Sequence, residues 1–347
     1  MKKYLILSAI AITFLVTSAR SQEVKTPYLT KSFSSANISI VISQTAGGNI
    51  SVTAVTGSES RVEVYVSQNG KWKNKLSDDE IKSKIAEGYD LVVSVNNGTL
   101  IASAKPKHSI TNWKNSLSFS FKIYAPQKVS TQLKTSGGNI GLTGLYGDQE
   151  FKTSGGNLSL NSLSGNIKGK TSGGNISINN CKNDLTVSTS GGNIFAENSE
   201  GHIIVSTSGG SVQLNGLKGN IEASTSGGNV KGENIEGTLS ARTSGGNVSL
   251  QKLSCSVKAS TSGGNIDVTV LHPGKYISLN NSAGQVRLVV PKNIGMDLRL
   301  NASKISTQNL INFSGENSTN EINGTVNGGG IPVTIDAGSG RIVLEFE

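Results

Sequence analysis

The sequence predicts an all-β protein: a parallel two-sheet β-solenoid, or β-helix, with 18-residue coils and one short helical insertion near residues 77–88. Three observations support this fold class. The tetrapeptide Thr-Ser-Gly-Gly recurs eight times at intervals of 18 residues, apolar and polar residues alternate inside each repeat, and aromatic residues make up only 5% of the chain. A thin repetitive β structure needs less aromatic bulk than a large globular core, and strict alternation is typical of strands with one buried face.

The first segment has the layout of a secretory signal peptide. Two lysines precede an apolar run from Tyr4 to about Ala19, and small residues at the −3 and −1 positions place a cleavage site after Ser21. We therefore expect residues 1–21 to be removed and the protein to be exported. The alternative is an uncleaved membrane anchor, although the run is short for a span. No Cys follows the run and no second apolar run exists, so we expect neither a lipoprotein nor a membrane span in the mature chain.

Residues 22–131 are predicted to form an N-terminal β region with a helical insertion that acts as a cap. Alternating apolar residues on both sides of the insertion indicate strands. The insertion begins with a capping box from Ser77 to Glu80, and Ile81 and Ile85 follow at helical spacing. Because a solenoid exposes an edge strand at each end, a helix here would protect one of these edges.

The repeat block is assigned to residues 132–290. When each unit is numbered from its Thr, the sixth, eighth, fifteenth and seventeenth positions are mostly aliphatic. Pairs spaced by two predict two strands in each unit, and equivalent columns would stack about 4.8 Å apart in two parallel sheets. An antiparallel meander shares this period and remains the alternative. The units begin at Thr135, Thr153, Thr171, Thr189, Thr207, Thr225, Thr243 and Thr261.

Two strands in each unit require two corners. The Gly-Gly pair is expected to form one corner, because glycine adopts a positive φ at little cost, and a Gly at the thirteenth position is expected to form the other. The Asn at the fifth position either makes an amide ladder between coils or tolerates the turn that follows Gly-Gly. These structural columns are represented by Gly137, Gly138, Asn139, Ile140, Gly191, Gly192, Asn193, Ile194, Gly263, Gly264, Asn265 and Ile266.

Outside the block, partial copies of the repeat continue the pattern. Thr45 begins an early copy, Asn281 begins a decayed one, and the segment that ends in Ile342 looks like a last one. Residues 291–347 are strand-like and are predicted to form C-terminal β coils that cap the solenoid.

The Thr-Ser-Gly-Gly-Asn-Ile coils, the strand-Pro elements that bracket them and the closing Ser-Gly-Arg-Ile segment resemble the bacterial "putative adhesin" families. These are β-strand-repeat domains of unknown function, with relatives called auto-transporter adhesin head domains. The resemblance covers roughly residues 35–347. It implies a two-sheet β-superhelix, export and a role in adhesion, and it supplies no catalytic residue. The helical segment departs from the repeat pattern.

The acidic residues of the repeats are few and fall in different columns. Glu197 and Glu233 share the ninth position two coils apart, about 9.6 Å by the stacking distance, which suits a carboxylate pair of a glycan-cleaving enzyme. We instead expect both to be solvated surface acids and predict no catalytic residue. A calcium-binding β-roll has an Asp column after its glycines. No such column exists here, so neither a metal nor a cofactor is predicted.

We therefore expect an exported, non-enzymatic adhesin that binds a surface glycan or protein through its faces or edges. The alternatives are a structural or regulatory envelope protein with a protein partner, and a polysaccharide-active β-helix enzyme. The formal net charge is +9, of which three positive charges lie in the leader. Since the basic residues are scattered and no stacking platform accompanies them, nucleic acid is not an expected partner. The ligand, the final compartment and the oligomeric state are left open by the sequence.

Overall fold

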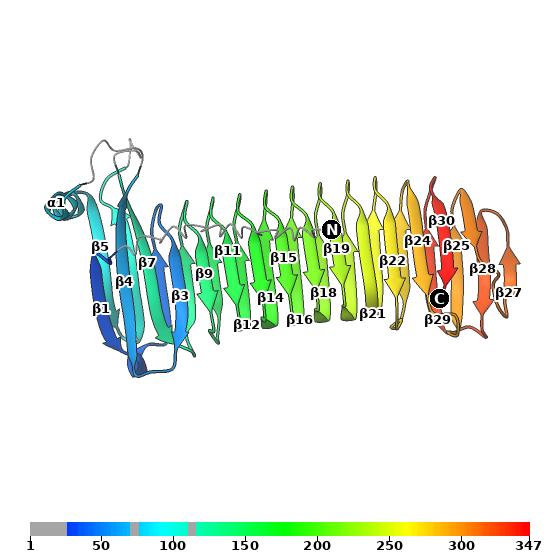
Figure 1. The fold of residues 1–347 in the computed structure, drawn as a ribbon, viewed down its shortest axis with the longest axis horizontal. Helices are drawn as coiled ribbons and strands as arrows, with labels where there is room; N and C mark the ends of the chain where they lie inside the picture. The colour runs from blue at the N-terminus through cyan, green and yellow to red at the C-terminus, as the bar shows by residue number, and fades with distance from the viewer. Residues whose placement is uncertain (1–25, 70–75, 110–115) are drawn as a thin grey trace, which may run out of the picture.

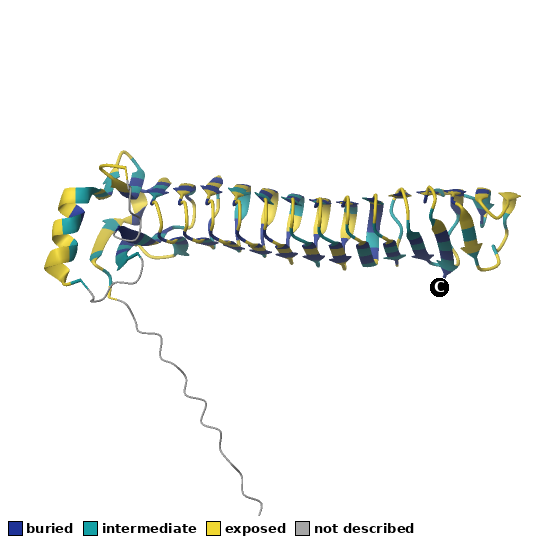
Figure 2. Ribbon diagram, turned by 90° about the horizontal axis from the view of Figure 1, so that it is seen from above, coloured by how far each residue is buried: buried dark blue, intermediate teal, exposed yellow. Residues whose placement is uncertain are grey.

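The computed structural model describes residues 26–69, 76–109 and 116–347, which form an elongated, solenoid-like stack of strands. The strands lie across the long axis, and successive coils follow one another along it (Figure 1). Buried and exposed residues alternate along the strands throughout the stack (Figure 2). The all-β, solenoid-like prediction is confirmed. The predicted signal peptide, residues 1–21, lies outside the described residues.

Two ladders of parallel strands run along the repeat block. Each strand pairs with the equivalent strand of the next coil, as Ile176 does with Ile194 and Leu185 with Ile203. Ladder A comprises β9 (Ile140–Thr143), β11 (Leu158–Asn161), β13 (Ile176–Asn179), β15 (Ile194–Glu197), β17 (Val212–Asn215), β19 (Val230–Glu233), β22 (Ile266–Val270) and β24 (Gln285–Val290). Ladder B comprises β8 (Ser130–Lys134), β10 (Gln149–Lys152), β12 (Ser164–Lys170), β14 (Lys182–Thr189), β16 (Glu200–Thr207), β18 (Lys218–Ser224), β20 (Glu236–Arg242) and β23 (Ile277–Asn281).

The strand between the seventh and eighth coils is continuous. β21 (Val248–Thr261) turns through the corner and pairs in both ladders, with a register shift after Leu250. Every pairing between coils from residue 130 to residue 290 is parallel, so the antiparallel meander is excluded for the repeats.

The inward columns make one narrow core. Ile194 and Ile221 are fully buried, and Leu214 is 1% exposed. Along each strand, inward-pointing residues alternate with outward-pointing ones, which is the two-residue period that the sequence shows. Since each inward side chain is surrounded mainly by the coils above and below it, the stability of the stack depends on neighbouring repeats.

The fifth-position Asn residues form a ladder of hydrogen bonds between coils. The backbone amide of Asn175 donates to Oδ1 of Asn157, 2.8 Å away, and the amide of Asn193 donates in the same way to Asn175. In the fifth coil Ser211 replaces Asn, and its hydroxyl accepts from the amide of Asn229 at 3.1 Å. Of the two interpretations of this column, the structure therefore shows the amide ladder.

The Gly-Gly pair lies at a corner between two strands, as predicted, but the predicted reason for glycine there is wrong. In the eight Thr-Ser-Gly-Gly units, all of which are described, neither glycine has a positive φ. The second glycine is required by close stacking instead, because a Cβ on Gly192 would lie 2.0 Å from the carbonyl oxygen of Gly174. The thirteenth-position corner does have a positive φ, as at Gly201 (126°). A further corner occurs at the tenth position, where Asn180 has φ 54° and Gly216 has φ 61°.

The N-terminal region enters the stack as a long insertion. The early copy of the repeat stacks directly on the first full unit, since Ile50 pairs with Ile140 and Thr135 donates to the carbonyl of Gly48 at 2.9 Å. The elements of the N-terminal region are β1 (Leu29–Ser34), η1 (Ser35–Asn37), β2 (Ile40–Gln44), β3 (Ile50–Val55), β4 (Glu59–Gln68), α1 (Asp78–Gly88), β5 (Tyr89–Asn96), β6 (Thr99–Pro106) and β7 (Leu117–Pro126). The chain between the two copies adds parallel strands to the stack, since β6 pairs with β2 and β7 pairs with β3.

The predicted helix is present as α1 and lies beside β5 at the end of the stack (Figure 1). Ser77 accepts from the amide of Glu80, and the Glu80 carboxylate accepts from the amide of Ser77, which is the predicted capping box. Ile85 is buried, while most of the helix is exposed (Figure 2).

The C-terminal end closes with two further parallel strands and an antiparallel flap. β29 continues ladder B from β23, and β30 continues ladder A from β24. The flap is formed where β28 pairs antiparallel with β25 and with β27. The elements are β25 (Met296–Asn301), β26 (Lys304–Thr307), β27 (Ser314–Asn317), β28 (Glu321–Val326), β29 (Ile331–Asp336) and β30 (Arg341–Phe346).

Candidate binding surfaces

The two acids singled out from the sequence lie on the outer face of ladder A. The register places Asn215 directly between Glu197 and Glu233. Glu233 forms an ion pair with Lys252, whose Nζ lies 2.7 Å from Oε1. The fold therefore brings these two carboxylates to one face but not into contact. Across the described ranges, no three His, Cys, Asp or Glu side chains gather as metal ligands would.

Ladder A also presents rows of small neutral side chains. Ser159 and Ser177 are neighbours in register at the seventh position, and Asn161 and Asn179 are neighbours at the ninth. These side chains lie outward because the sixth and eighth positions point into the core. The face consequently offers hydroxyl and amide groups at the spacing of the coils.

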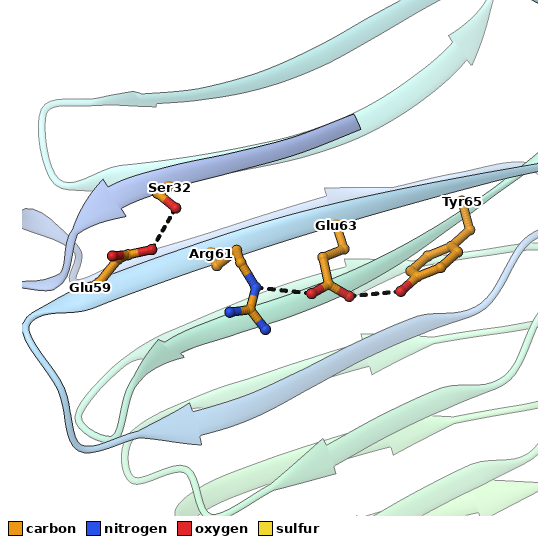
Figure 3. A network of polar contacts seen from close by, with 5 residues as sticks. All are labelled: Ser32, Glu59, Arg61, Glu63 and Tyr65. Atoms are coloured by element: carbon orange, nitrogen blue, oxygen red, sulfur yellow. Dashed lines mark hydrogen bonds and ion pairs between the residues drawn. The ribbon is translucent and has the colours of Figure 1, made fainter. Parts of the chain in front are cut away.

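A polar network lies at the N-terminal end of the same face. Arg61, Glu63 and Tyr65 alternate on β4 and point to one side of the strand (Figure 3). Nε of Arg61 lies 2.9 Å from Oε1 of Glu63, and the Tyr65 hydroxyl donates to Oε2 of Glu63 at 2.7 Å. Nearby, the Ser32 hydroxyl of β1 donates to Glu59 (Figure 3). The carboxylate of Glu63 is thus held by two donors.

Two cationic side chains lie over aromatic rings at this end of the face. The Arg61 guanidinium carbon lies 4.3 Å from the centroid of the Tyr124 ring, and Nζ of Lys122 lies 4.8 Å from that of Tyr65. The hydrogen bond to Glu63, together with burial, raises the pKa of Tyr65 to about 12, so the phenol stays protonated and acts as a donor. No sequence motif marks this cluster, because its members lie on outward positions of the irregular N-terminal region.

A shallow groove of about 630 Å³ crosses the outer face of ladder B near β8, β10 and β12. Side chains at the sixteenth and eighteenth positions form its two walls, and the backbone at the seventeenth position forms its floor. Four lysines and one acid line it. They are Lys134, Lys152, Lys168, Lys170 and Glu150.

Residues 179–345 match a known family. The family model that matches this part of the chain is described as Toastrack DUF4097. The resemblance to a β-strand-repeat family of unknown function that the repeats suggested is thereby confirmed. The Toastrack DUF4097 match starts within the third coil and ends in β30, and the 18-residue period continues upstream of it without a change of register.

The chain matches no curated protein. Among the solved structures similar to it are two bacterial proteins. One is a "putative adhesin" from Bacteroides fragilis, with 20% identity and a TM-score of 0.41, covering 69% of this chain and 96% of that one. The other is a "putative cell adhesion protein" from Clostridium sporogenes, with 12% identity and a TM-score of 0.19, covering 92% of this chain and 99% of that one. No helix in the described part of the chain is long and apolar enough to cross a membrane.

Proposed function

We propose that the protein is an exported, non-enzymatic two-sheet β-helix that binds a glycan or a protein of the cell surface or envelope through its faces. The observation that carries this proposal is the set of in-register outward rows on ladder A. At the ninth position six of the eight coils carry a hydroxyl or amide side chain, the exceptions being Glu197 and Glu233, and eight coils spaced by about 4.8 Å extend this row over roughly 38 Å. Hydroxyl and amide groups repeated at a fixed distance suit a ligand that is itself a repeating, hydroxyl-rich chain.

The placement of the acids supports binding over glycan cleavage. Paired carboxylates of a glycosidase flank one scissile bond from opposite sides. Glu197 and Glu233 instead project from the same face, with Asn215 between them and Lys252 paired to Glu233. The proposal therefore assigns no catalytic role to either residue.

Export is the second part of the proposal and rests on the leader. We expect the mature chain to begin near Gln22 and to be found in the periplasm, at the cell surface or in the medium. Intact-mass measurement of the fractionated protein tests this. A cytoplasmic protein that retains residues 1–21 would contradict it.

Glycan-array binding by the mature protein tests the ligand-binding part. We expect binding to a defined subset of glycans without release of shorter products. The Glu197→Gln/Glu233→Gln variant should still bind, because each glutamine places an amide in the ninth-position row, as Asn215 does. Release of new reducing ends by the wild type, abolished in this variant, would establish the enzyme alternative. Binding to no glycan, with capture of a defined envelope protein, would establish the protein-partner alternative.

A further inference from the structure

Three lysines lie in register on the outer face of ladder B. Lys134 on β8 pairs with Lys152 on β10, and Lys152 pairs with Lys170 on β12. All three side chains are exposed, and none of them forms an ion pair with another described residue. Like charges that face each other across neighbouring strands destabilise a sheet. This column therefore carries a cost that the fold itself does not offset.

A second column of ladder B shows how the fold neutralises stacked charges. At the twelfth position, residues of alternating sign stack in register from Lys182 through Glu200 and Lys218 to Glu236. Nζ of Lys182 lies 2.8 Å from Glu200, and Nζ of Lys218 lies 3.1 Å from Glu236. The hydrogen bond and the charge of Lys182 hold the pKa of Glu200 below its ordinary value. At the eighteenth position, by contrast, three successive coils all carry a lysine and no acid alternates with them.

The unpaired lysines line the groove on ladder B. Lys168, at the sixteenth position, adds a fourth positive charge, and Glu150 is the one acid among the residues that line the groove. The groove thus carries a net charge of +3. It is straight, because equivalent positions of successive coils are paired in register.

We propose that this groove binds an extended acidic polysaccharide, a chain with regularly repeated carboxylates that lies along the solenoid axis. This inference goes beyond the proposed function, because it assigns a second ligand surface on ladder B, separate from the rows of ladder A, and names its ligand class. The regular spacing of the ammonium groups matches a polymer with a repeated charge. Gln132 and Thr186, at the sixteenth position in the opposite wall, offer an amide and a hydroxyl to the hydroxyl groups of the sugars.

A polysaccharide suits the groove better than an acidic peptide. An extended peptide usually binds a sheet through main-chain hydrogen bonds at a free edge. Here the floor is made of β8, β10 and β12, and β10 is paired on both sides, with β8 and with β12. Recognition must therefore come from side chains, and lysine ammonium groups contact carboxylates as point charges.

Titration of the mature protein with polygalacturonate, a linear polyuronate, tests the inference, with an uncharged linear glucan as the reference polymer. We expect binding of polygalacturonate only. Binding should be lost at about 1 M salt, where the Debye length is about 3 Å. The Lys134→Gln/Lys152→Gln/Lys170→Gln variant should bind at least tenfold more weakly, and Glu150→Gln should bind more tightly.

The matched control removes three exposed lysines elsewhere, as Lys258→Gln/Lys275→Gln/Lys292→Gln, and should retain wild-type affinity. Both triple variants should fold, and the groove variant should melt no lower than the wild type, because it loses only facing like charges. If both triple variants weakened binding equally, the groove would not be the binding site, and the binding would reflect only the overall positive charge of the protein. Failure to bind polygalacturonate, with binding of neutral glycans on the array, would overturn the inference but leave the proposed function standing. Tighter binding of poly-glutamate than of polygalacturonate would replace the ligand class with an acidic polypeptide.

Discussion

Thr189 donates a hydrogen bond from its hydroxyl to the carbonyl oxygen of Gly174, which lies 2.8 Å away in the preceding coil. The same hydroxyl accepts from the amide of Gly192 at 3.3 Å, so one side chain joins two coils at the corner. Thr189 is only 5% exposed. This pair of bonds recurs in every unit from Thr135 to Thr261. The first column of the repeat is therefore a buried ladder and not a row of free hydroxyls.

Thr189→Val should destabilise the protein by about 1–3 kcal/mol, the cost of leaving buried polar groups without a partner. Valine has nearly the shape of threonine, so the effect isolates the lost hydrogen bonds at Gly174 and Gly192. The midpoint of urea unfolding measures it. Ser190→Ala removes an exposed hydroxyl next to it and should change the free energy of unfolding by less than about 0.5 kcal/mol. Equal midpoints for the two variants would contradict the role of the Thr ladder.

The two glycines of one corner should respond differently to alanine. A Cβ on Gly192 would lie 2.0 Å from the carbonyl oxygen of Gly174, which only a backbone shift can relieve. A Cβ on Gly191 would come no closer than 3.6 Å to the carbonyl oxygen of Ser172. We expect Gly192→Ala to cost about 3 kcal/mol or more, at the upper end for overpacking, and Gly191→Ala to be tolerated. Thermal melts of the two variants measure the difference, and a tolerated Gly192→Ala would refute the close stacking of the corners.

The inward columns could be predicted from the sequence because burial follows the two-residue period closely. Ile176, Ile194 and Val212 share the sixth position, pair in register and are buried. The role of Gly-Gly could not be predicted, since a sequence shows a glycine but not whether a dihedral angle or a close neighbour requires it. The tenth-position corner was visible as a column of mostly Gly and Asn, such as Asn180 and Asn198, and was missed.

The junction with the N-terminal region shows what a repeat period cannot predict. Gln149 occupies a fifteenth position, where other coils have an aliphatic residue, yet it is 1% exposed. Its side chain accepts from the Thr131 hydroxyl and donates to the carbonyl of Val129, both at 2.8 Å. Thr131 and Val129, which bond to the buried Gln149 side chain, precede the first full unit, so the repeat pattern does not reveal them. The lysine groove was missed for a related reason, because outward positions carry no periodic constraint and their pairing depends on register.

Cys181 and Cys255 should remain free thiols that react only after unfolding. Both are 1% exposed, and four coils of about 4.8 Å separate them by roughly 19 Å, beyond the Cα limit of about 7 Å for a disulfide. Burial raises the pKa of both thiols, and that of Cys255 to about 12, so the reactive thiolate is suppressed in the folded state. Iodoacetamide at neutral pH should label neither residue in the native protein and both in denaturant. A peptide map with a Cys181–Cys255 bridge would contradict the parallel stack.

The raised pKa of Cys255 also predicts a pH dependence of stability. The unfolded thiol loses its proton near pH 9 and the folded thiol near pH 12, so ionisation favours the unfolded state within this window. The contribution of this residue is thus fully present below about pH 9 and is lost as the pH rises toward about 12. Cys255→Ala should flatten the fall in melting temperature above pH 9. The same slope in wild type and variant would contradict the burial effect.

The last prediction concerns the sixth-position column, on which the architecture depends. Ile194 is fully buried in a core one side chain deep, so Ile194→Asp should lose about 1.5–3 kcal/mol of burial and add the cost of an unpaired carboxylate. We expect the variant to melt far lower or to fail to accumulate. Glu197→Gln, three residues away on the exposed side of the same strand, should leave both the melting temperature and glycan binding unchanged. A well-folded Ile194→Asp protein would refute the inward assignment of this column. Loss of a glycan-cleaving activity in a well-folded Glu197→Gln protein would instead refute the non-enzymatic proposal, because the fold would be intact and only the chemistry would be gone.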